Sequence, residues 1–244
     1  MEKTIKVQHL SKSYSGKKVV DDISFTVGRG EVFGLLGANG AGKSTTIECI
    51  LGTKQQDAGE VSILDMHPST HRKQLFEKVG VQFQESNYQD KLKVEELCKV
   101  TQALYKTSMD YLELLNKFGL GDKKSQLISA LSGGEKQRLF IVLALIPDPE
   151  VVFLDELTTG LDSRARRDVW MCLSELKAKG LTILLTSHFM DEVEVLCDQI
   201  CILKKGQMVF KGTVAEAISS SPHARLEDAY LWYTDEEVLE NESI

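Results

Sequence analysis

EVFGLLGANGAGKSTTIECIL, residues 31–51, is the stretch that decides the fold of this chain. It opens with an apolar run typical of a buried strand, passes through a glycine-rich turn, and continues with apolar residues at helical spacing. Residues 37–44, GANGAGKS, match the pattern GxxxxGK[ST] and join that strand to that helix. A strand, a glycine-rich loop and a helix in this order predict a phosphate-binding loop at the edge of an α/β sheet.

The glycines of this loop let backbone N–H groups face a bound polyphosphate, because they lack side chains and tolerate positive φ. The following helix adds the partial positive charge of its N-terminus. We expect Lys43 to reach the β- and γ-phosphates and Ser44 to present its hydroxyl to Mg²⁺. The residues predicted to hold ATP at this loop are Gly37, Asn39, Gly40, Gly42, Lys43, Ser44 and Thr45.

Short apolar or alternating segments outside this stretch indicate strands that alternate with helices. The predicted strands are residues 5–10, 19–27, 61–64, 79–83, 151–154, 181–186, 200–203 and 208–210. The first two alternate apolar and polar residues, as antiparallel strands with one solvated face do. Residues 94–144 instead carry apolar residues such as Leu97, Val100 and Leu104 at helical spacing. The predicted fold class is α/β: a P-loop NTPase core with a mainly parallel sheet, an N-terminal antiparallel β subdomain and an inserted helical subdomain.

A second functional pair follows the apolar run at residues 151–154. Asp155 emerges at the C-terminal end of that predicted strand, where open α/β sheets bind ligands. We expect Asp155 to act as a magnesium ligand, through water. Glu156 comes next and is the candidate general base that polarises the attacking water. An acidic helix N-terminus is the alternative explanation for Glu156 alone, but the adjacent Asp155 favours catalysis.

Composition excludes several other classes of protein. The formal net charge is −7, so no positive field exists to hold a nucleic-acid backbone, and nucleic acid is not an expected partner. The apolar runs are far shorter than the roughly 20 residues that cross a bilayer, so we expect no direct membrane insertion. Residues 1–9 lack the features of a secretory signal. Five scattered cysteines form no paired pattern, which argues against disulfides and a zinc site.

A second helix start lies upstream of the Asp155 strand. In residues 131–135, LSGGE, Ser132 and Glu135 have the spacing of a capping box. Gly133 and Gly134 leave the tip of that helix without side chains, so its N–H groups and positive dipole offer another anion site. A helix that is merely well capped would show the same capping pattern.

With these residues in view, the sequence resembles the ABC ATPase family from residue 5 to about residue 233, because LSGGE is similar to that family's LSGGQ motif. The resemblance implies that two chains sandwich two nucleotides, with Ser132, Gly133 and Gly134 of one chain against the γ-phosphate held by the other. It also implies roles for four further positions. These are Tyr14 as an aromatic stacked on adenine, Gln84 as a sensor of Mg²⁺ and the lytic water, Asp162 in a loop that crosses the dimer interface, and His188 as the switch histidine.

For Tyr14 and Gln84 an alternative assignment exists, and for His188 the preceding strand supports the role. Tyr14 could instead serve packing alone. Gln82 competes with Gln84, although the strand register favours Gln84. His188 follows the predicted strand 181–186, and a neutral imidazole there could donate to the γ-phosphate while holding Glu156 and the water.

Two residues depart from the family pattern. Glu135 replaces the usual glutamine and adds negative charge near a phosphate site, although it can still close the capping box. Leu157 stands where the family usually has proline, so the loop before Asp162 loses one restraint on φ. The resemblance also predicts the organisation of the chain: residues 1–233 as a single ABC ATPase domain, with its helical subdomain at about 94–144, and residues 234–244 as an acidic C-terminal tail.

The predicted function is that of the ATP-binding and ATP-hydrolysing subunit of an ABC transporter, with ATP and Mg²⁺ as cofactors. The expected partners are a membrane-spanning permease subunit, which we expect to dock on residues 83–94, and a second copy of the chain or a paralogous ATPase subunit. Residues 226–231 and 31–36 resemble bacterial drug-resistance-type exporters, which favours export. The expected location is cytoplasmic, on the inner face of the cell membrane.

Three other readings compete with transport. One is a soluble ABC ATPase that serves a cytoplasmic assembly such as iron–sulfur cluster biogenesis. A ribosome-associated ABC factor would resemble two fused cassettes with basic segments, and a phosphate-loop kinase would lack the LSGGE motif.

Overall fold

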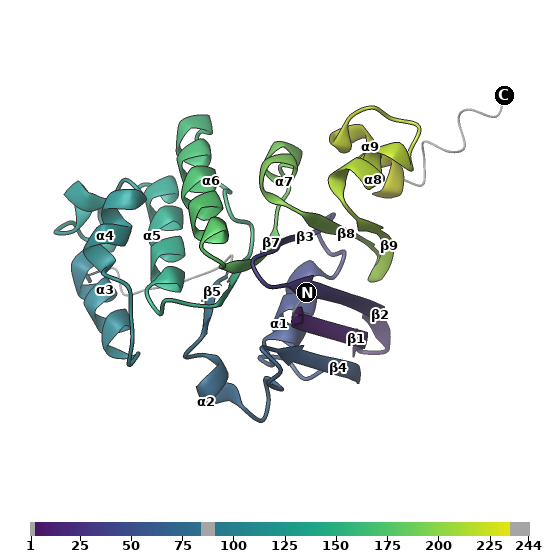
Figure 1. Cartoon of the computed structure of the whole chain (residues 1–244), viewed down its shortest axis with the longest axis horizontal. Helices are drawn as coiled ribbons and strands as arrows, with labels where there is room; N and C mark the ends of the chain where they lie inside the picture. Colours follow the sequence, from purple (N-terminus) through teal and green to yellow (C-terminus); the bar gives the residue numbers. More distant parts are fainter. Residues whose placement is uncertain (1–2, 84–90, 235–244) are drawn as a thin grey trace.

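The computed structural model describes residues 3–83 and 91–234 as two sheets with helices between and around them (Figure 1). The smaller sheet is antiparallel and has the strand order β2-β1-β4. Its strands are β1 (Lys3–Tyr14), β2 (Lys17–Gly28) and β4 (Ala58–Ile63). This pairing confirms the predicted antiparallel N-terminal sheet. Alternate residues of β2, such as Ile23, Phe25 and Val27, are buried on one face, as the alternating pattern predicted.

The larger sheet has six strands in the order β5-β6-β7-β3-β8-β9. All neighbours pair in parallel except β8 and β9, which form an antiparallel hairpin at one edge. The strands are β3 (Val32–Gly37), β5 (Val79–Gln82), β6 (Val151–Leu154), β7 (Thr182–Thr186), β8 (Gln199–Lys204) and β9 (Gln207–Gly212). The central strands β3, β6 and β7 are buried along their whole length, which explains their near-continuous apolar sequences.

Nine α-helices occur in the described residues. They are α1 (Lys43–Ile50), α2 (Arg72–Leu75), α3 (Val94–Ala103), α4 (Tyr111–Lys117), α5 (Gly133–Leu145), α6 (Ser163–Ala178), α7 (Met190–Leu196), α8 (Val214–Ser219) and α9 (Leu226–Thr234). Two short 3₁₀ turns, Gly121–Lys123 and Ile128–Ala130, precede α5. None of the helices in residues 3–83 and 91–234 is long and apolar enough to span a membrane.

Three clusters of buried hydrophobic side chains hold the two sheets and the helices together. Helix α1 lies between the sheets, where Ile47 and Ile50 pack with Phe33 and Phe153 from the large sheet and with residues of the small one. The opposite face of the large sheet packs against α5 and α6, and the β8 end of that face packs against α7, α8 and α9. Figure 1 shows α3, α4 and α5 on the left, α8 and α9 at the upper right, and the small sheet below α8 and α9.

The structure differs from the sequence-based expectation in three places. Val100 and Leu104, counted as part of a helical apolar stripe, are 56% and 75% exposed, because α3 buries Val94, Leu97 and Cys98 instead. The short helix α2 was not predicted. Strand β1 runs four residues past the expected end, through a bulge at His9, which has a φ of 52°.

The predicted domain boundaries remain predictions. Helices α3, α4 and α5 do lie between β5 and β6, where the helical subdomain was expected. Of the acidic tail 234–244, only Thr234 belongs to the described part of the chain.

Candidate functional site

The topology brings three polar segments to one edge of the large sheet. Strands β6, β7 and β3 are adjacent and parallel, with Leu154 opposite Leu185 and Leu35 opposite Thr186. The segments at the C-terminal ends of these strands are residues 37–44, 155–156 and 186–188. Because neighbouring strands lie about 5 Å apart, side chains far apart in sequence meet at this edge.

The phosphate loop needs glycine for steric reasons at two positions. Gly42 has a φ of 105°, and a Cβ there would lie 2.4 Å from the Val19 carbonyl oxygen. Gly37 has a φ of 152°, and a Cβ there would lie 2.6 Å from the Leu203 carbonyl oxygen. The loop is therefore in close contact with β2 and the β8–β9 hairpin, which leaves no room for a side chain at either glycine.

The outer side of the same loop is open. Asn39 and Gly40 are exposed, and a Cβ on Gly40 would meet nothing within 4 Å. Ser44, in the first turn of α1, is also exposed, and Thr45 is half-buried. The loop thus has one exposed block, residues 38–40, between buried residues at 37 and 41–43, so part of its backbone is open to a ligand.

Lys43 points into the loop. Its side chain is buried, and its Nζ donates to the carbonyl oxygens of Gly37 at 2.7 Å and Ala38 at 3.2 Å. Burial lowers the pKa of Lys43, whereas the nearby carboxylates of Glu156 and Asp155 raise it. The predicted phosphate-binding lysine and the two predicted acidic residues are therefore close enough to interact.

Thr186 links Asp155 to Glu156. Its hydroxyl donates to Asp155 Oδ1 at 2.6 Å and accepts the backbone N–H of Glu156 at 2.8 Å. Thr186 is fully buried, and Asp155 is 5% exposed. The Asp155 carboxylate is thereby fixed at the end of β6 by a side chain from the neighbouring strand.

The Glu156 carboxylate is held by two other side chains. His188 Nε2 lies 2.7 Å from Oε1, and the Thr159 hydroxyl donates to Oε2 at 3.4 Å. The predicted base and the predicted switch histidine are thus in direct contact. An imidazole N–H that donates to this carboxylate would keep Glu156 oriented, as a general base requires.

Glu192 of α7 holds the loop that carries His188. This fully buried carboxyl accepts from Trp170 Nε1 at 3.1 Å and from the Ser187 hydroxyl. Burial raises the pKa of Glu192, and these two hydrogen bonds act in the opposite direction. His188 therefore sits on a loop that α6 and α7 both support.

The tip of α5 has the capping box that the sequence predicted. Ser132 Oγ accepts the Glu135 N–H at 3.2 Å, and Glu135 Oε2 accepts the Ser132 N–H at 2.8 Å. The bond from the Ser132 N–H holds the pKa of Glu135 below its usual range, and Lys123 Nζ lies 3.4 Å from the same carboxylate. The added negative charge of Glu135 is therefore partly balanced within the chain.

The same tip is accessible from outside the molecule. Ser132 and Gly133 are exposed, and a Cβ on Gly133 would meet nothing within 4 Å. An anion or a neighbouring molecule can therefore approach the free N–H groups at the start of α5.

Asp162 has a structural task in the single chain. Its Oδ1 accepts the N–H groups of Arg164 at 3.0 Å and Ala165 at 2.8 Å, which makes it the N-cap of α6. The bond from Ala165 is the main reason that the pKa of Asp162 is lowered. The expected position of Asp162 at a dimer interface remains a prediction.

Tyr14 ends β1 and is 41% exposed. The ammonium groups of Lys12 and Lys54 lie 5.4 and 5.6 Å from its ring centre, which is cation–π distance. The stacking of this exposed ring on adenine remains a prediction.

Of the two glutamine candidates, Gln84 lies outside the described residues. Gln82 is buried, and its Nε2 donates to the carbonyl oxygens of Phe83 at 2.8 Å and Asp155 at 3.2 Å. Gln82 thus supports the backbone of Asp155, and Gln84 remains the predicted sensor.

The oxygen donors at this site suit Mg²⁺, which takes few protein ligands, better than a metal whose ligands all come from the protein. No group of three or more His, Cys, Asp or Glu residues that could hold a metal occurs in residues 3–83 and 91–234. The chain offers a hydroxyl, Ser44 in the first turn of α1, and a carboxylate, Asp155 directly after β6. Mg²⁺ typically binds one or two such groups together with phosphate and water, so these residues fit.

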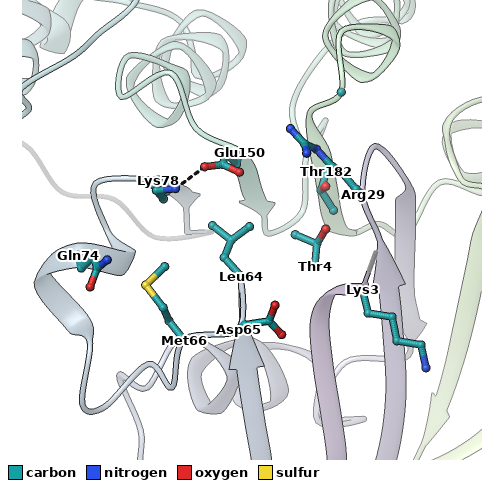
Figure 2. A pocket seen from close by; sticks show the side chains of 11 residues that line it. Lys3, Thr4, Arg29, Leu64, Asp65, Met66, Gln74, Lys78, Glu150 and Thr182 are labelled. Carbon is teal, nitrogen blue, oxygen red and sulfur yellow. Dashed lines mark hydrogen bonds and ion pairs between the residues drawn. The ribbon is translucent and has the colours of Figure 1, made fainter. Parts of the chain in front are cut away.

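A separate hollow of about 310 Å³ lies at the opposite edge of the large sheet, where β5, β6 and β7 begin (Figure 2). Lys78 Nζ and Glu150 Oε1 form an ion pair of 2.7 Å across its upper rim in that view. Asp65, also on its lining, pairs with Lys6. Lys78, Glu150 and Asp65 on its lining are thus already engaged in ion pairs.

Sequence reasoning missed Thr186 and Glu192 as contributors to this site. The signal for Thr186 was a polar residue that ends a buried strand. Glu192 gave no signal, because a glutamate in the first turn of a helix is ordinary.

Comparison with known proteins gives a consistent family. A family model described as ABC transporter matches residues 20–159, which include the phosphate loop, LSGGE and Asp155-Glu156. Nod factor export ATP-binding protein I of Rhizobium johnstonii is 41% identical over 224 residues, which cover 90% of this chain and 70% of that protein. The protein of the same name from Bradyrhizobium diazoefficiens is 42% identical over 206 residues, which cover 82% and 67%.

Solved structures agree with this match. An ATP-binding subunit of an ABC transporter, 31% identical, superposes with a TM-score of 0.87 over 95% of this chain and 100% of that chain. A dimeric bacterial ABC transporter cassette, 24% identical, shares the fold with a TM-score of 0.78 over 86% and 98%.

Proposed function

The chain belongs to the ABC transporter family as an ATP-binding, ATP-hydrolysing subunit, and on that premise we propose that two such subunits enclose ATP between them. The partner is a second copy of this chain or a paralogous ATPase subunit. The observation that carries this proposal is the exposed tip of α5, where Ser132 and Gly133 leave N–H groups open to an anion. One cradle, residues 37–44, takes the triphosphate, and the α5 tip of the other subunit closes on its γ-phosphate.

Hydrolysis then needs a base and a polarised phosphate at one place. The Glu156 carboxylate takes a proton from a water molecule as the water oxygen bonds to the γ-phosphorus and the bond to the β–γ bridging oxygen breaks. His188 keeps the carboxylate oriented through its 2.7 Å contact. Lys43 balances the charge on the phosphates. Ser44 and Asp155 would hold Mg²⁺, which would supply neutralisation of phosphate charge when bound.

We propose that the energy drives export through a separate membrane-spanning permease, at the cytoplasmic face of the membrane. Support comes from the names of the relatives, which are export ATP-binding proteins. The proposed docking segment, residues 83–94, falls mostly on residues outside the described part of the chain; of that segment, Leu92 packs against the helical core.

A mixing experiment tests the shared site. Lys43→Ala disables the phosphate loop, and Ser132→Arg blocks the α5 tip, so each variant alone should be inactive. In an equal mixture, a dimer with one chain of each kind retains one complete site. The mixture should recover roughly a quarter of the wild-type rate, because half of randomly paired dimers carry one site of two. A mixture that stays inactive while wild type hydrolyses ATP would contradict the shared site.

The transport role needs its own test. The chain should co-purify from detergent-solubilised membranes with a polypeptide that has several membrane-spanning helices, and that polypeptide should stimulate its ATPase rate. Co-purification with a cytoplasmic assembly alone would instead support the soluble alternative.

A further inference from the structure

Glu156 has a backbone conformation that residues other than glycine rarely adopt, with a φ of 53°. Such a conformation persists only where surrounding groups hold it. On the N-terminal side of the residue, the Glu156 N–H is held by Thr186 Oγ1 at 2.8 Å. The peptide group on the other side needs an anchor of its own.

That anchor comes from α5. Gln137 Nε2 donates to the carbonyl oxygen of Glu156 at 3.1 Å and to that of Leu157 at 3.0 Å. A primary amide has two N–H bonds, so it can serve both acceptors at once. Because peptide groups are planar, fixing the groups on both sides of the Glu156 Cα fixes φ and ψ, and with them the direction in which the side chain leaves the backbone.

We propose that Gln137 is a positioning residue that aims the Glu156 carboxylate at the attacking water. This inference rests on the proposed function, since it requires Glu156 to act as the base. Gln137 touches neither nucleotide nor water in this role. It acts through the backbone of Glu156, as Thr186 does from the other side.

A close contact reinforces the link between α5 and the loop after β6. A Cβ on Gly134 would lie 3.1 Å from Leu161 Cδ2 and 3.2 Å from the Gly160 carbonyl oxygen. The first two turns of α5 therefore touch the loop at both ends, through Gly134 and through Gln137. The direction of Glu156 consequently depends on the position of the same helix whose tip is exposed at Ser132.

The test replaces the amide while keeping the length of the side chain. Gln137→Met removes both donors. We expect kcat for ATP hydrolysis to fall about tenfold to a hundredfold, a loss typical of a misaligned general base. The KM for ATP and the affinity for nucleotide should stay within about twofold, because no ligand contact is lost. Gln137→Leu, which also lacks the donors, should behave in the same way and serves if the methionine variant folds poorly.

Gln102→Met is the matched control. Gln102 in α3 also holds a loop with its amide, through Ser108 Oγ at 3.0 Å and the Met109 carbonyl oxygen at 3.3 Å. It should lower the melting temperature by a similar amount and leave kcat unchanged. A purely structural role for Gln137 predicts that both variants behave alike.

A double variant makes the test specific to Glu156. In the Glu156→Gln background, adding Gln137→Met should leave the residual rate unchanged, because the base is already lost. The proposal is overturned if Gln137→Met keeps its kcat, or if it lowers the rate by the same factor in both backgrounds. Wild-type protein that fails to hydrolyse ATP would instead refute the proposed function.

Discussion

Thr186→Val is the substitution that most directly tests the geometry of the acidic pair. Valine has nearly the same shape as threonine, so the buried volume is kept and only the hydroxyl is lost. The change removes the 2.6 Å bond to Asp155 Oδ1 and the 2.8 Å bond from the Glu156 N–H. Both groups lose a partner in a place that water hardly reaches, since Thr186 is fully buried and Asp155 is 5% exposed.

The size of the effect follows from these two losses. An unsatisfied buried polar group costs about 1–3 kcal/mol, and more when it is charged, so we expect about 2–4 kcal/mol of lost stability. For a chain of this length that lowers the melting temperature by about 4–16 °C. Because the same hydroxyl restrains the backbone of Glu156, kcat should also fall by about tenfold or more.

Thr186→Ser is the matched control, because it keeps the hydroxyl and loses only a methyl group. Its expected cost is about 1 kcal/mol, with kcat within about threefold of wild type. Thermal unfolding and steady-state phosphate release measure the two effects. The reasoning fails if the valine and serine variants melt at the same temperature, or if the valine variant turns over as fast as the serine variant.

Three further predictions follow from the same site. Glu156→Gln should bind ATP and accumulate as an ATP-bound dimer, so size-exclusion chromatography with ATP that shows only monomer would count against the shared site. Tyr14→Ala should weaken binding of a fluorescent ATP analogue about tenfold if the ring stacks on adenine, and Tyr14→Phe should not; equal affinities would leave Tyr14 with packing alone. The lowered pKa of Glu135 means that its stabilising contribution is present above its ordinary pKa of about 4.5 and is lost as pH falls through the lower folded value. The difference in melting temperature between wild type and Glu135→Gln should therefore shrink below that pH, and a difference that grows there would contradict the capping role.

The sequence predicts those features of the molecule that depend on local pattern. The apolar run at 151–154 marks a strand buried on both faces, and the S-x-x-E spacing at Ser132 predicts a capping box, because each depends on residues close in the chain. The phosphate loop is local in the same sense. These features therefore need no knowledge of the strand order.

Features that depend on contacts between separate elements cannot be predicted from local sequence pattern. Thr186 meets Asp155 only because β7 lies beside β6, and the chain order does not specify that adjacency. Gln137 and Glu156 are 19 residues apart and come from different elements. Likewise, the spacing of Val100 and Leu104 fits a buried stripe, but the rotation of α3 places both at the surface.

Leu157 shows how the structure compensates for a residue that departs from the family pattern. Without proline, this loop loses a fixed φ, yet the Leu157 N–H donates to the Thr186 carbonyl oxygen at 3.4 Å, a bond that proline cannot make. The Leu157 side chain is fully buried, and its own carbonyl oxygen accepts from Gln137. A proline ring would restrain the backbone at this position. Here a weak backbone hydrogen bond, the buried Leu157 side chain and the Gln137 amide restrain it instead. Glu156 lies immediately before Leu157 and has a strained conformation. Its backbone therefore depends on contacts from other elements more than it would in a loop with proline. We therefore expect small changes at Thr186 and Gln137 to affect catalysis most.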